Sequence, residues 1–366
     1  MRILHIIYSL TSGGVQRFVV DLCNELSAKG HEVHLCVMLD DRIDGFGFFV
    51  RDISPAVHYQ NLRIPSGFRL SNIFRFYKVI REIKPDIVHC HLNLVNYVFP
   101  LTYRFRKMAF FQTIHNDAPR EVTNKVEYRL RRFFYKNGKV RPITISEEST
   151  RSFVEYYRTD QYTEIYNGGH KPVESEEFGE VKRSFEKLRE DRKMIFLHVA
   201  RFAAQKNQEM LIRTFNRLIQ ENFPVALLVI GSDFDSPKGK ELQGKAMNGI
   251  WFLGEKHNIA DYYLNADAFC LTSIFEGMPI TLIESFACGC IPICTPVGGI
   301  INTIHHRVNG FISPSVSEED YYNTVLEFIK FGDQIHKKDL TDFFKEKLSM
   351  EACAQKHISE YHKSVS

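Results

Sequence analysis

Short apolar runs that alternate with helical segments constrain the fold of this chain more than any other feature. Ile3–Tyr8 and Glu32–Met38 have the length of buried strands, and Val15–Lys29 between them has apolar residues at helical spacing before Gly30. The same alternation recurs along most of the chain. Because continuous apolar strands separated by helices form parallel sheets covered on both faces, the sequence predicts a doubly wound α/β fold.

The length of the chain favours two such domains. A chain of 366 residues can form two separate cores, and we place the domains at residues 1–170 and 171–349. We interpret the charged stretch Val173–Arg192 as containing the crossing between them. The hydrophobic content of 44% and the charged content of 25% are typical of a soluble globular protein. No uninterrupted apolar run reaches the ~18 residues of a membrane-spanning helix.

The eight cysteines lie in apolar runs and form no C-x-x-C pair. Such cysteines are more often small buried hydrophobic residues than metal ligands. We therefore expect reduced thiols and a cytoplasmic location.

Two carboxylates eight positions apart, Glu276 and Glu284, border the most informative stretch. Gly277 frees the backbone between them, Pro279 suits a first helical turn, and Gly289 closes the following apolar run. Glu276 is therefore expected just before a short buried helix, and Glu284 within it. The helix N-terminus suits a phosphate, whereas the carboxylates suit hydroxyl groups of a ribose or a sugar ring. The alternative is structural, with one acid complementing the helix dipole and the other paired inside the fold.

Residues after two other predicted strands suggest the same kind of ligand. Gly13 and Gly14 follow the first strand, where parallel sheets bind ligands, although the loop lacks the G-x-G-x-x-G of a dinucleotide fold. Arg201 and Lys206 follow the strand that begins at Met194. Two fixed cations can stabilise a leaving diphosphate without a metal.

Three histidines lie at the ends of predicted strands. His89 and His91 are two positions apart and therefore share one face of a strand, but no third ligand follows at metal spacing. We accordingly expect no metal site. His115 follows the strand that contains Phe110, and a purely structural role is the alternative for it.

A strongly basic segment lies in the first domain. Residues 103–141 hold 11 basic and 3 acidic residues, in a chain of net charge +3. Within it, Asn124–Asn137 predicts a basic amphipathic helix rich in aromatic residues. Its candidate membrane-contacting cations are Arg129, Arg131, Arg132 and Lys136. Such helices bind anionic membrane surfaces; a solvated face and a nucleic-acid site are the alternatives, and no recognition motif supports nucleic acid.

The stretch Phe275–Gly289 resembles the E-x7-E signature of the retaining GT-B glycosyltransferases of family 4. The family shows E-G-x-P before the second acid and a V-G-G turn, found here at Val297–Gly299, while Ser285 replaces the usual Ala. Ala200 similarly replaces a Gly in the family's strand-G-R-x-x-x-x-K-N pattern. Matches to D-[IV]-[IV]-H-x-H, T-x-H-[DN] and N-G-x-L-V extend the resemblance over nearly the whole chain.

The resemblance implies a GT-B architecture and a role for each candidate residue. Two Rossmann-like domains would face each other across a cleft, with the helical tail 350–366 joined to the first domain. Arg201 and Lys206 would hold the donor diphosphate, Glu284 the ribose, and Glu276 the donor sugar. The remaining donor-binding residues would be Gly13, Gly14, Gly277, Met278 and Pro279. His115 would lie at the transferred sugar, and His91 near the cleft on the acceptor side.

The implied activity is transfer of a hexose from a nucleotide-sugar to a glycan or a lipid-linked glycan, and we expect the donor to be a UDP-sugar. The reaction would belong to polysaccharide biosynthesis, such as that of lipopolysaccharide or capsule. The reaction would retain the anomeric configuration and need neither metal nor other cofactor. The enzyme would be cytoplasmic, bound peripherally to the inner face of the membrane. A sugar-nucleotide 2-epimerase of the same fold, a non-catalytic sugar-nucleotide-binding protein and a nucleic-acid-binding protein are the alternatives.

Overall fold

The computed structural model describes residues 1–43, 45–67, 69–116, 118–191 and 194–365. It divides into two compact units, of which unit 1 comprises Met1–Gly169 with Leu348–Ser366, and unit 2 comprises His170–Lys347. Arg192 and Ser366, which end two of the segments interpreted above, lie outside the described residues. Each unit is built on one parallel sheet, which confirms the predicted α/β class.

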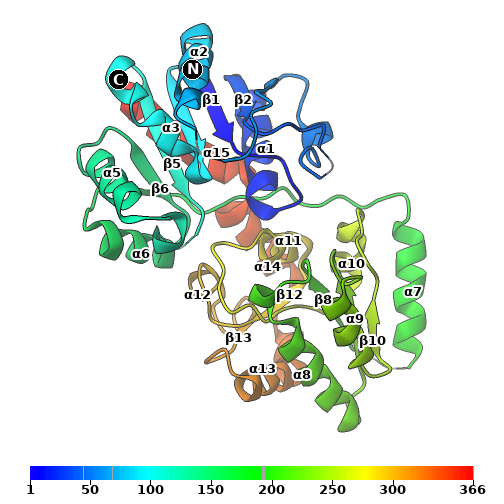
Figure 1. The fold of residues 1–366 in the computed structure, drawn as a ribbon. Helices are drawn as coiled ribbons and strands as arrows, with labels where there is room; N and C mark the ends of the chain where they lie inside the picture. The colour runs from blue at the N-terminus through cyan, green and yellow to red at the C-terminus, as the bar shows by residue number, and fades with distance from the viewer. Residues whose placement is uncertain (44, 68, 117, 192–193, 366) are drawn as a thin grey trace. The chain divides into compact units, whose positions relative to one another are not determined.

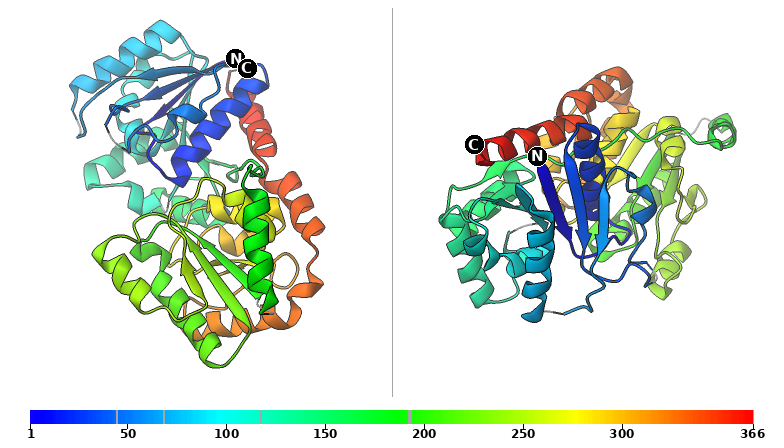
Figure 2. Two further views of the ribbon diagram at one scale, coloured as in Figure 1. Left: turned by 90° about the vertical axis from the view of Figure 1, so that its right-hand side faces the viewer. Right: turned by 90° about the horizontal axis from the view of Figure 1, so that it is seen from above.

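Unit 1 has a seven-stranded sheet in the order β3-β2-β1-β4-β5-β6-β7, with helices on both faces (Figures 1 and 2). The strands are β1 (Arg2–Ile7), β2 (Glu32–Val37), β3 (His58–Asn61), β4 (Ile87–His91), β5 (Ala109–Ile114), β6 (Arg141–Thr144) and β7 (Thr163–Glu164). The helices are α1 (Gly14–Ala28), α2 (Ser71–Ile83), α3 (Val95–Val98), α4 (Leu101–Arg104), α5 (Lys125–Lys136), α6 (Glu147–Tyr157) and α15 (Met350–Val365). The central strands are buried along their whole length, as continuous apolar runs require.

The C-terminal helix α15 completes unit 1. It packs beside α1 and against β5 (Figure 1). Its buried residues Cys353, His357 and Tyr361 recur every four positions and form one face of the helix. Residues 353–361 of α15 therefore contribute to the core of unit 1, which also contains the first strand, β1.

Unit 2 has a six-stranded sheet in the order β10-β9-β8-β11-β12-β13. The strands are β8 (Met194–Val199), β9 (Val225–Ile230), β10 (Ile250–Phe252), β11 (Ala268–Leu271), β12 (Ile291–Cys294) and β13 (Phe311–Ile312). The helices are α7 (Phe178–Glu190), α8 (Gln208–Gln220), α9 (Pro237–Gly244), α10 (Ile259–Asn265), α11 (Ile280–Cys288), α12 (Ile300–Thr303), α13 (Glu318–Phe331) and α14 (Lys337–Phe343).

The interpretation that Val173–Arg192 contains the crossing is wrong, because unit 2 already begins at His170. Thirteen of these residues form a helix of unit 2, with Val181 and Phe185 buried on one face. Arg189 fixes the end of the helix by donating two hydrogen bonds, each 2.9 Å long, to the carboxylate of Asp267. Only two residues of this helix are buried, so the many charged residues around them obscured its amphipathic pattern in the sequence.

Each sheet reverses its strand order at one place, between β1 and β4 in unit 1 and between β8 and β11 in unit 2. Ligands of doubly wound sheets bind at the carboxyl ends of the strands beside such a reversal. The loops that carry most of the predicted site residues leave the sheets at these two places.

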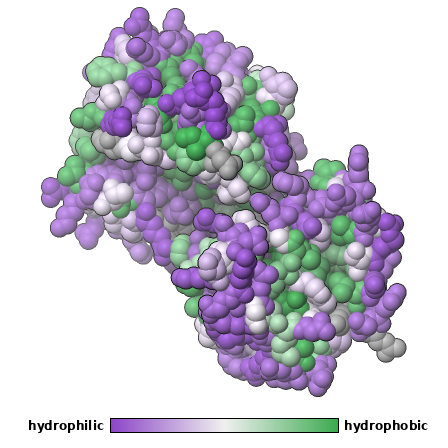
Figure 3. All heavy atoms as spheres, turned by 45° about the vertical axis from the view of Figure 1, so that its right-hand side comes forward, coloured by the Kyte–Doolittle hydropathy of each residue, from purple (hydrophilic) through white to green (hydrophobic). Residues whose placement is uncertain are grey.

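Other general properties of the chain concern its thiols and its surface. All eight cysteines are free and buried. None of the described helices is long and apolar enough to cross a membrane. The face seen in Figure 3 is covered mostly by hydrophilic residues, interrupted by patches of hydrophobic ones.

Candidate active site

An ion pair joins the two loops at the strand reversal of unit 2. The loop after β8 carries Lys206, and the loop after β11 carries Glu276. Lys206 Nζ donates to Glu276 Oε1 across 2.5 Å, and the two side chains are only 17% and 7% exposed. Ser273 Oγ donates to the same carboxylate oxygen across 2.6 Å.

The second oxygen of Glu276 is less occupied. Among the described residues, this oxygen accepts one hydrogen bond, from Gln205 Nε2 at 3.4 Å. The contact is weak at this distance, and the same nitrogen donates to the carbonyl of Phe275 at 2.8 Å. Thr272 Oγ1 adds a further link between the loops by donating to the Lys206 carbonyl across 2.9 Å. The carboxylate is therefore held rigidly through one oxygen and retains capacity to accept a hydrogen bond through the other.

A glycine turn after β12 fixes the backbone of the Glu276 loop. Gly298 has φ +55, and a Cβ on it would lie 1.9 Å from the Glu276 carbonyl oxygen. Gly299 N–H donates to the Gly277 carbonyl across 2.7 Å. Only glycine allows this close approach, so the V-G-G turn and the E-G loop form one packed unit.

The helix that follows begins and ends where the sequence predicts. Pro279 precedes the first residue of α11, and Gly289, with φ +68, ends it as a left-handed cap. Glu276 lies before this helix, and Glu284 lies half-buried within it. Tyr263 Oη lies 3.5 Å from Glu284 Oε2 and donates to the Thr281 carbonyl at 3.1 Å. Burial and the charge of Glu284 raise the pKa of Tyr263, which stays protonated as a donor.

The remaining donor-site residues predicted for unit 2 differ in exposure. Arg201 is exposed and its guanidinium has no ion-pair partner in the part of the chain that the structure describes. Met278 is buried, and its sulfur lies 3.7 Å from Thr303 Oγ1. The sequence analysis did not identify Gln205 and Ser273 as site residues. The signal that could have indicated Ser273 is a pair of polar residues, Thr272 and Ser273, directly after an apolar strand.

In unit 1 the structure brings His91 and His115 together. His115 is 3% exposed, and its Nε2 lies 3.1 Å from His91 Nδ1. His91 is fully buried, and its expected place near the cleft on the acceptor side stays a prediction. Gly13 and Gly14 lie at the start of α1, partly open to solvent.

The basic helix α5 divides into a buried and an exposed face. Arg131 is fully buried; it donates to Glu127 Oε1 at 2.7 Å and to Asn93 Oδ1 at 2.9 Å, and it lies 3.6 Å from Glu121. The prediction that Arg131 contacts a membrane is therefore wrong, because its charge is satisfied inside the unit. Arg132 is half-buried and donates to the Tyr157 carbonyl at 2.9 Å.

The exposed face of α5 combines cations with apolar side chains. We call it the α5 patch; it consists of Lys125, Val126, Arg129, Leu130, Phe133 and Lys136. Val126, Leu130 and Phe133 are 66%, 48% and 51% exposed. Their spacing of four and three residues places them in one stripe along the helix.

Two family models match the chain, one in each unit. The model described as Glycosyl transferases group 1 matches residues 180–342, and the model described as Glycosyltransferase Family 4 matches residues 12–168. Fold, site and matches together define a glycosyltransferase with two Rossmann-like domains.

Curated relatives and solved structures agree with this class. The capsular polysaccharide biosynthesis glycosyltransferase CapH of Staphylococcus aureus is 23% identical over 315 residues, covering 81% of this chain and 82% of CapH. The N-acetylgalactosamine-N,N'-diacetylbacillosaminyl-diphospho-undecaprenol 4-alpha-N-acetylgalactosaminyltransferase of Campylobacter jejuni is 26% identical over 304 residues, covering 79% of each chain. The crystal structure of Anabaena HepE in complex with UDP and glucose has a TM-score of 0.78 at 16% identity, covering 99% of this chain and all of that one. The matches and the fold together support a glycosyltransferase of GT-B type.

Proposed function

We propose that this protein transfers a hexose from a UDP-sugar to a lipid-linked glycan, with retention of the anomeric configuration and without a metal. The observation that carries the proposal is the Lys206–Glu276 pair at the strand reversal of unit 2. It places a cation and a carboxylate with a spare acceptor side by side at the edge where doubly wound sheets bind ligands.

The chemistry of the pair suits a sugar diphosphate. Breaking the bond between the sugar and the diphosphate builds negative charge on the leaving group. Arg201 is exposed, lacks an ion-pair partner among the described residues, and shares a loop with Lys206. Two cations in one loop stabilise the leaving diphosphate in the way that fixed charges do in phosphate-binding sites.

Glu276 and Glu284 supply the acceptors that the hydroxyl groups of the donor need. Glu276 Oε2 is the less occupied oxygen and would accept from a hydroxyl of the transferred sugar, whereas half-buried Glu284 would accept from the ribose. In a retaining reaction the acceptor oxygen bonds to the anomeric carbon on the face that the diphosphate leaves. The acceptor proton then passes to the leaving phosphate oxygen, so no protein nucleophile is needed.

The nucleotide and the acceptor class are suggested by the relatives. The solved complex of HepE contains UDP and glucose, and the name of the Campylobacter jejuni relative specifies a diphospho-undecaprenol acceptor. A lipid-linked acceptor requires that the enzyme reach a membrane.

The α5 patch supplies a membrane-binding surface with the required composition. Its three exposed cations are each worth ~1 kcal/mol near an anionic membrane. Its stripe of Val126, Leu130 and Phe133 has the exposed apolar area that interfacial helices insert between head groups. Attachment would be peripheral and reversible, on the inner face of the cytoplasmic membrane.

A thermal-shift screen tests the donor. UDP-, GDP-, ADP- and dTDP-sugars are added in turn, with and without EDTA; a ligand at about 100 times its Kd adds ~2.7 kcal/mol of stability. We expect the largest shift with a UDP-sugar, unchanged by EDTA. A shift that EDTA removes, or no shift with any sugar nucleotide, would contradict the proposed donor site.

A further inference from the structure

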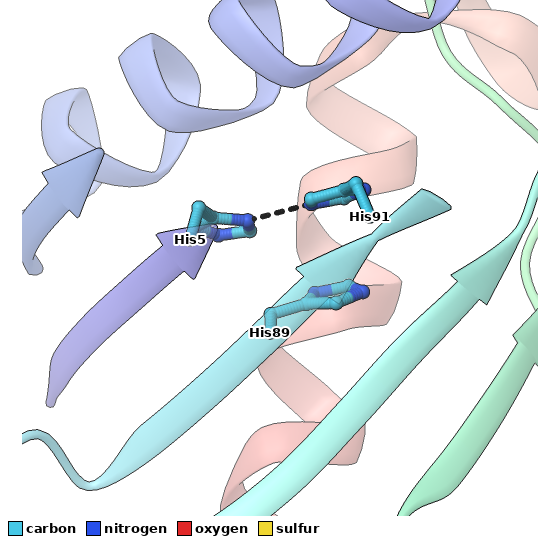
Figure 4. Close-up of side chains that lie close together, drawn as sticks. All are labelled: His5, His89 and His91. Carbon is cyan, nitrogen blue, oxygen red and sulfur yellow. Dashed lines mark hydrogen bonds between the residues drawn. The ribbon is translucent and has the colours of Figure 1, made fainter. Parts of the chain in front are cut away.

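Five histidines lie together in the core of unit 1, in a group that we call the histidine cluster. It consists of His5 on β1, His89 and His91 on β4, His115 after β5, and His357 on α15. His5 and His89 are directly opposite each other on neighbouring strands. Three of the rings are drawn in Figure 4, where His5 and His91 point toward each other. A group of five buried imidazoles is not explained by packing alone, because burial disfavours polar groups.

Three of these rings form a continuous hydrogen-bonded chain. His5 Nδ1 lies 3.0 Å from His91 Nε2, and His91 Nδ1 lies 3.1 Å from His115 Nε2. The ring centroids of these two pairs are 5.3 and 5.4 Å apart, with planes inclined by 16° and 34°. The rings therefore meet edge to edge, and His91 is the middle member.

The geometry does not suit a metal at His5, His89 and His91. His89 is stacked on His91 with centroids 4.5 Å apart and planes inclined by 23°. A metal lies in the plane of each imidazole that binds it, and stacked rings direct their lone pairs in parallel rather than toward one point. Both nitrogens of His89 are also engaged, one 2.6 Å from Tyr361 Oη and the other 2.8 Å from Thr113 Oγ1.

The three rings of the chain are neutral at physiological pH. Burial lowers the pKa of His5 and of His115 to about 3, and it lowers the pKa of His91 well below its usual range. A neutral imidazole has one N–H and one lone pair. Two hydrogen bonds among three such rings can form in only two ways: all three carry the proton on Nδ1, or all three carry it on Nε2.

The two ends of the chain lack partners. His115 Nδ1 and His5 Nε2 are buried and have no hydrogen-bond partner among the described residues. When all three protons are on Nδ1, His115 offers an N–H at its free end; when all are on Nε2, it offers a lone pair. The tautomers of His5 and His115 are therefore linked: His115 Nδ1 carries a proton only when His5 Nε2 does not.

We infer that His5 and His91 are positioning residues that couple the tautomer of His115 to their own. A change at His5 then alters whether His115 Nδ1 donates to or accepts from a hydroxyl of the transferred sugar. This inference rests on the proposed function, and the place of His115 at the transferred sugar is what the family resemblance implies. The shared tautomer itself depends only on the geometry of unit 1. His5 and His91 are both fully buried and so act only through His115.

Nitrogen-15 NMR of the full-length protein, labelled at histidine, tests the shared tautomer without any ligand or assay. Protonated and bare ring nitrogens have distinct shifts, and single variants assign the three rings. We expect His5, His91 and His115 to carry the proton on the same type of nitrogen. We expect His5→Phe to change the tautomer populations of His115, and the buried control His357→Phe to leave them unchanged. Different tautomers within the chain, or an unchanged His115 in His5→Phe, would overturn the inference.

Kinetics of transfer test the functional half. His5→Phe should lower kcat about tenfold or more with little change in KM for the donor, because an interaction made in the transition state is lost. His5→Asn places an amide near the position of Nδ1, keeps a partner for His91, and should recover most of kcat. Equal kinetics for wild type and a folded His5→Phe would contradict positioning. If no transfer is detected at all, the proposed function fails, while the NMR result still stands on its own.

Discussion

Glu276 accepts two short hydrogen bonds through one oxygen, from Lys206 at 2.5 Å and from Ser273 at 2.6 Å. The sequence pointed to Lys206 and Glu276 as members of one site but assigned them to different parts of the donor. Their direct contact depends on β8 and β11 being neighbours in the sheet, which no pattern within either segment reveals. The Lys206–Glu276 pair therefore places one positive and one negative charge side by side in the site before any ligand binds.

The two cations of the β8 loop should respond differently to substitution. Lys206→Ala leaves the nearly buried Glu276 without its cation, so we expect both a lower melting temperature and a loss of transfer. Arg201→Ala removes an exposed side chain and should lower transfer by 10²–10³-fold, about 2.7–4 kcal/mol, with an unchanged melting temperature. Differential scanning fluorimetry and initial rates check both variants. Arg201→Ala with full activity would remove it from the site.

Helices α5 and α7 show what an element's own sequence leaves undetermined. The basic pattern of Asn124–Asn137 predicts the helix, and Asn124 caps it by accepting from Val126 N and Glu127 N. Which cation is buried was not predictable, because the partners of Arg131 include Asn93, on another segment. In α7 the two buried apolar residues were too few to stand out from the charges.

The α5 patch should determine binding to anionic vesicles. We expect wild type to sediment with anionic but not neutral liposomes at low salt, and to be released by high salt. Arg129→Ser with Lys136→Ser should stay in the supernatant, and Phe133→Ser should bind more weakly. The matched control, Arg183→Ser with Lys187→Ser on α7, removes the same charge from another exposed helix.

Arg131 offers a contrast within the same helix. Arg131→Met removes the cation from buried Glu127 and Glu121, and we expect it to cost about 3–5 kcal/mol of folding stability.

If wild type does not sediment with anionic vesicles at low salt, the α5 patch is a solvated face and a soluble acceptor becomes the better proposal.

For the whole molecule, the fold class and most elements followed from the sequence, because continuous apolar strands and glycine-capped helices are local signals. The packing of α15 into unit 1 was expected only from resemblance. The histidine cluster was beyond sequence reasoning, since it combines residues from β1, β4, the loop after β5 and α15 that meet only in three dimensions. Its consequence is a property of the whole folded chain, namely its response to acid.

We predict that unfolding becomes markedly easier as the pH falls below about 6.5. Burial lowers the pKa of His5 and His115 to about 3 and that of His357 to about 4, so the unfolded chain binds protons that the folded chain does not. Stability is therefore present above the unfolded pKa and lost below it, by ~1.4 kcal/mol per pH unit for each such histidine. Glu121 has the opposite effect on the free energy of unfolding. Burial raises its pKa to about 7, so below this pH the folded chain binds a proton that the unfolded chain does not.

Urea unfolding at pH 7, 6 and 5 measures this effect. The free energy of unfolding should fall steeply across the series. In His357→Phe the slope of the free energy of unfolding against pH should decrease by about the contribution of one proton, ~1.4 kcal/mol per pH unit. A stability independent of pH between 7 and 5 would mean that the cluster is protonated in the folded protein.

The most direct test of the proposed activity is the anomeric configuration of the product. Wild type and Glu276→Gln are incubated with a UDP-hexose, a lipid-linked glycan acceptor and EDTA, and the product is analysed by proton NMR. We predict a new glycosidic bond with the configuration of the donor in wild type, and a rate lowered by 10²-fold or more in Glu276→Gln. An inverted product, an epimerised sugar nucleotide, or transfer that requires Mn²⁺ would contradict the account.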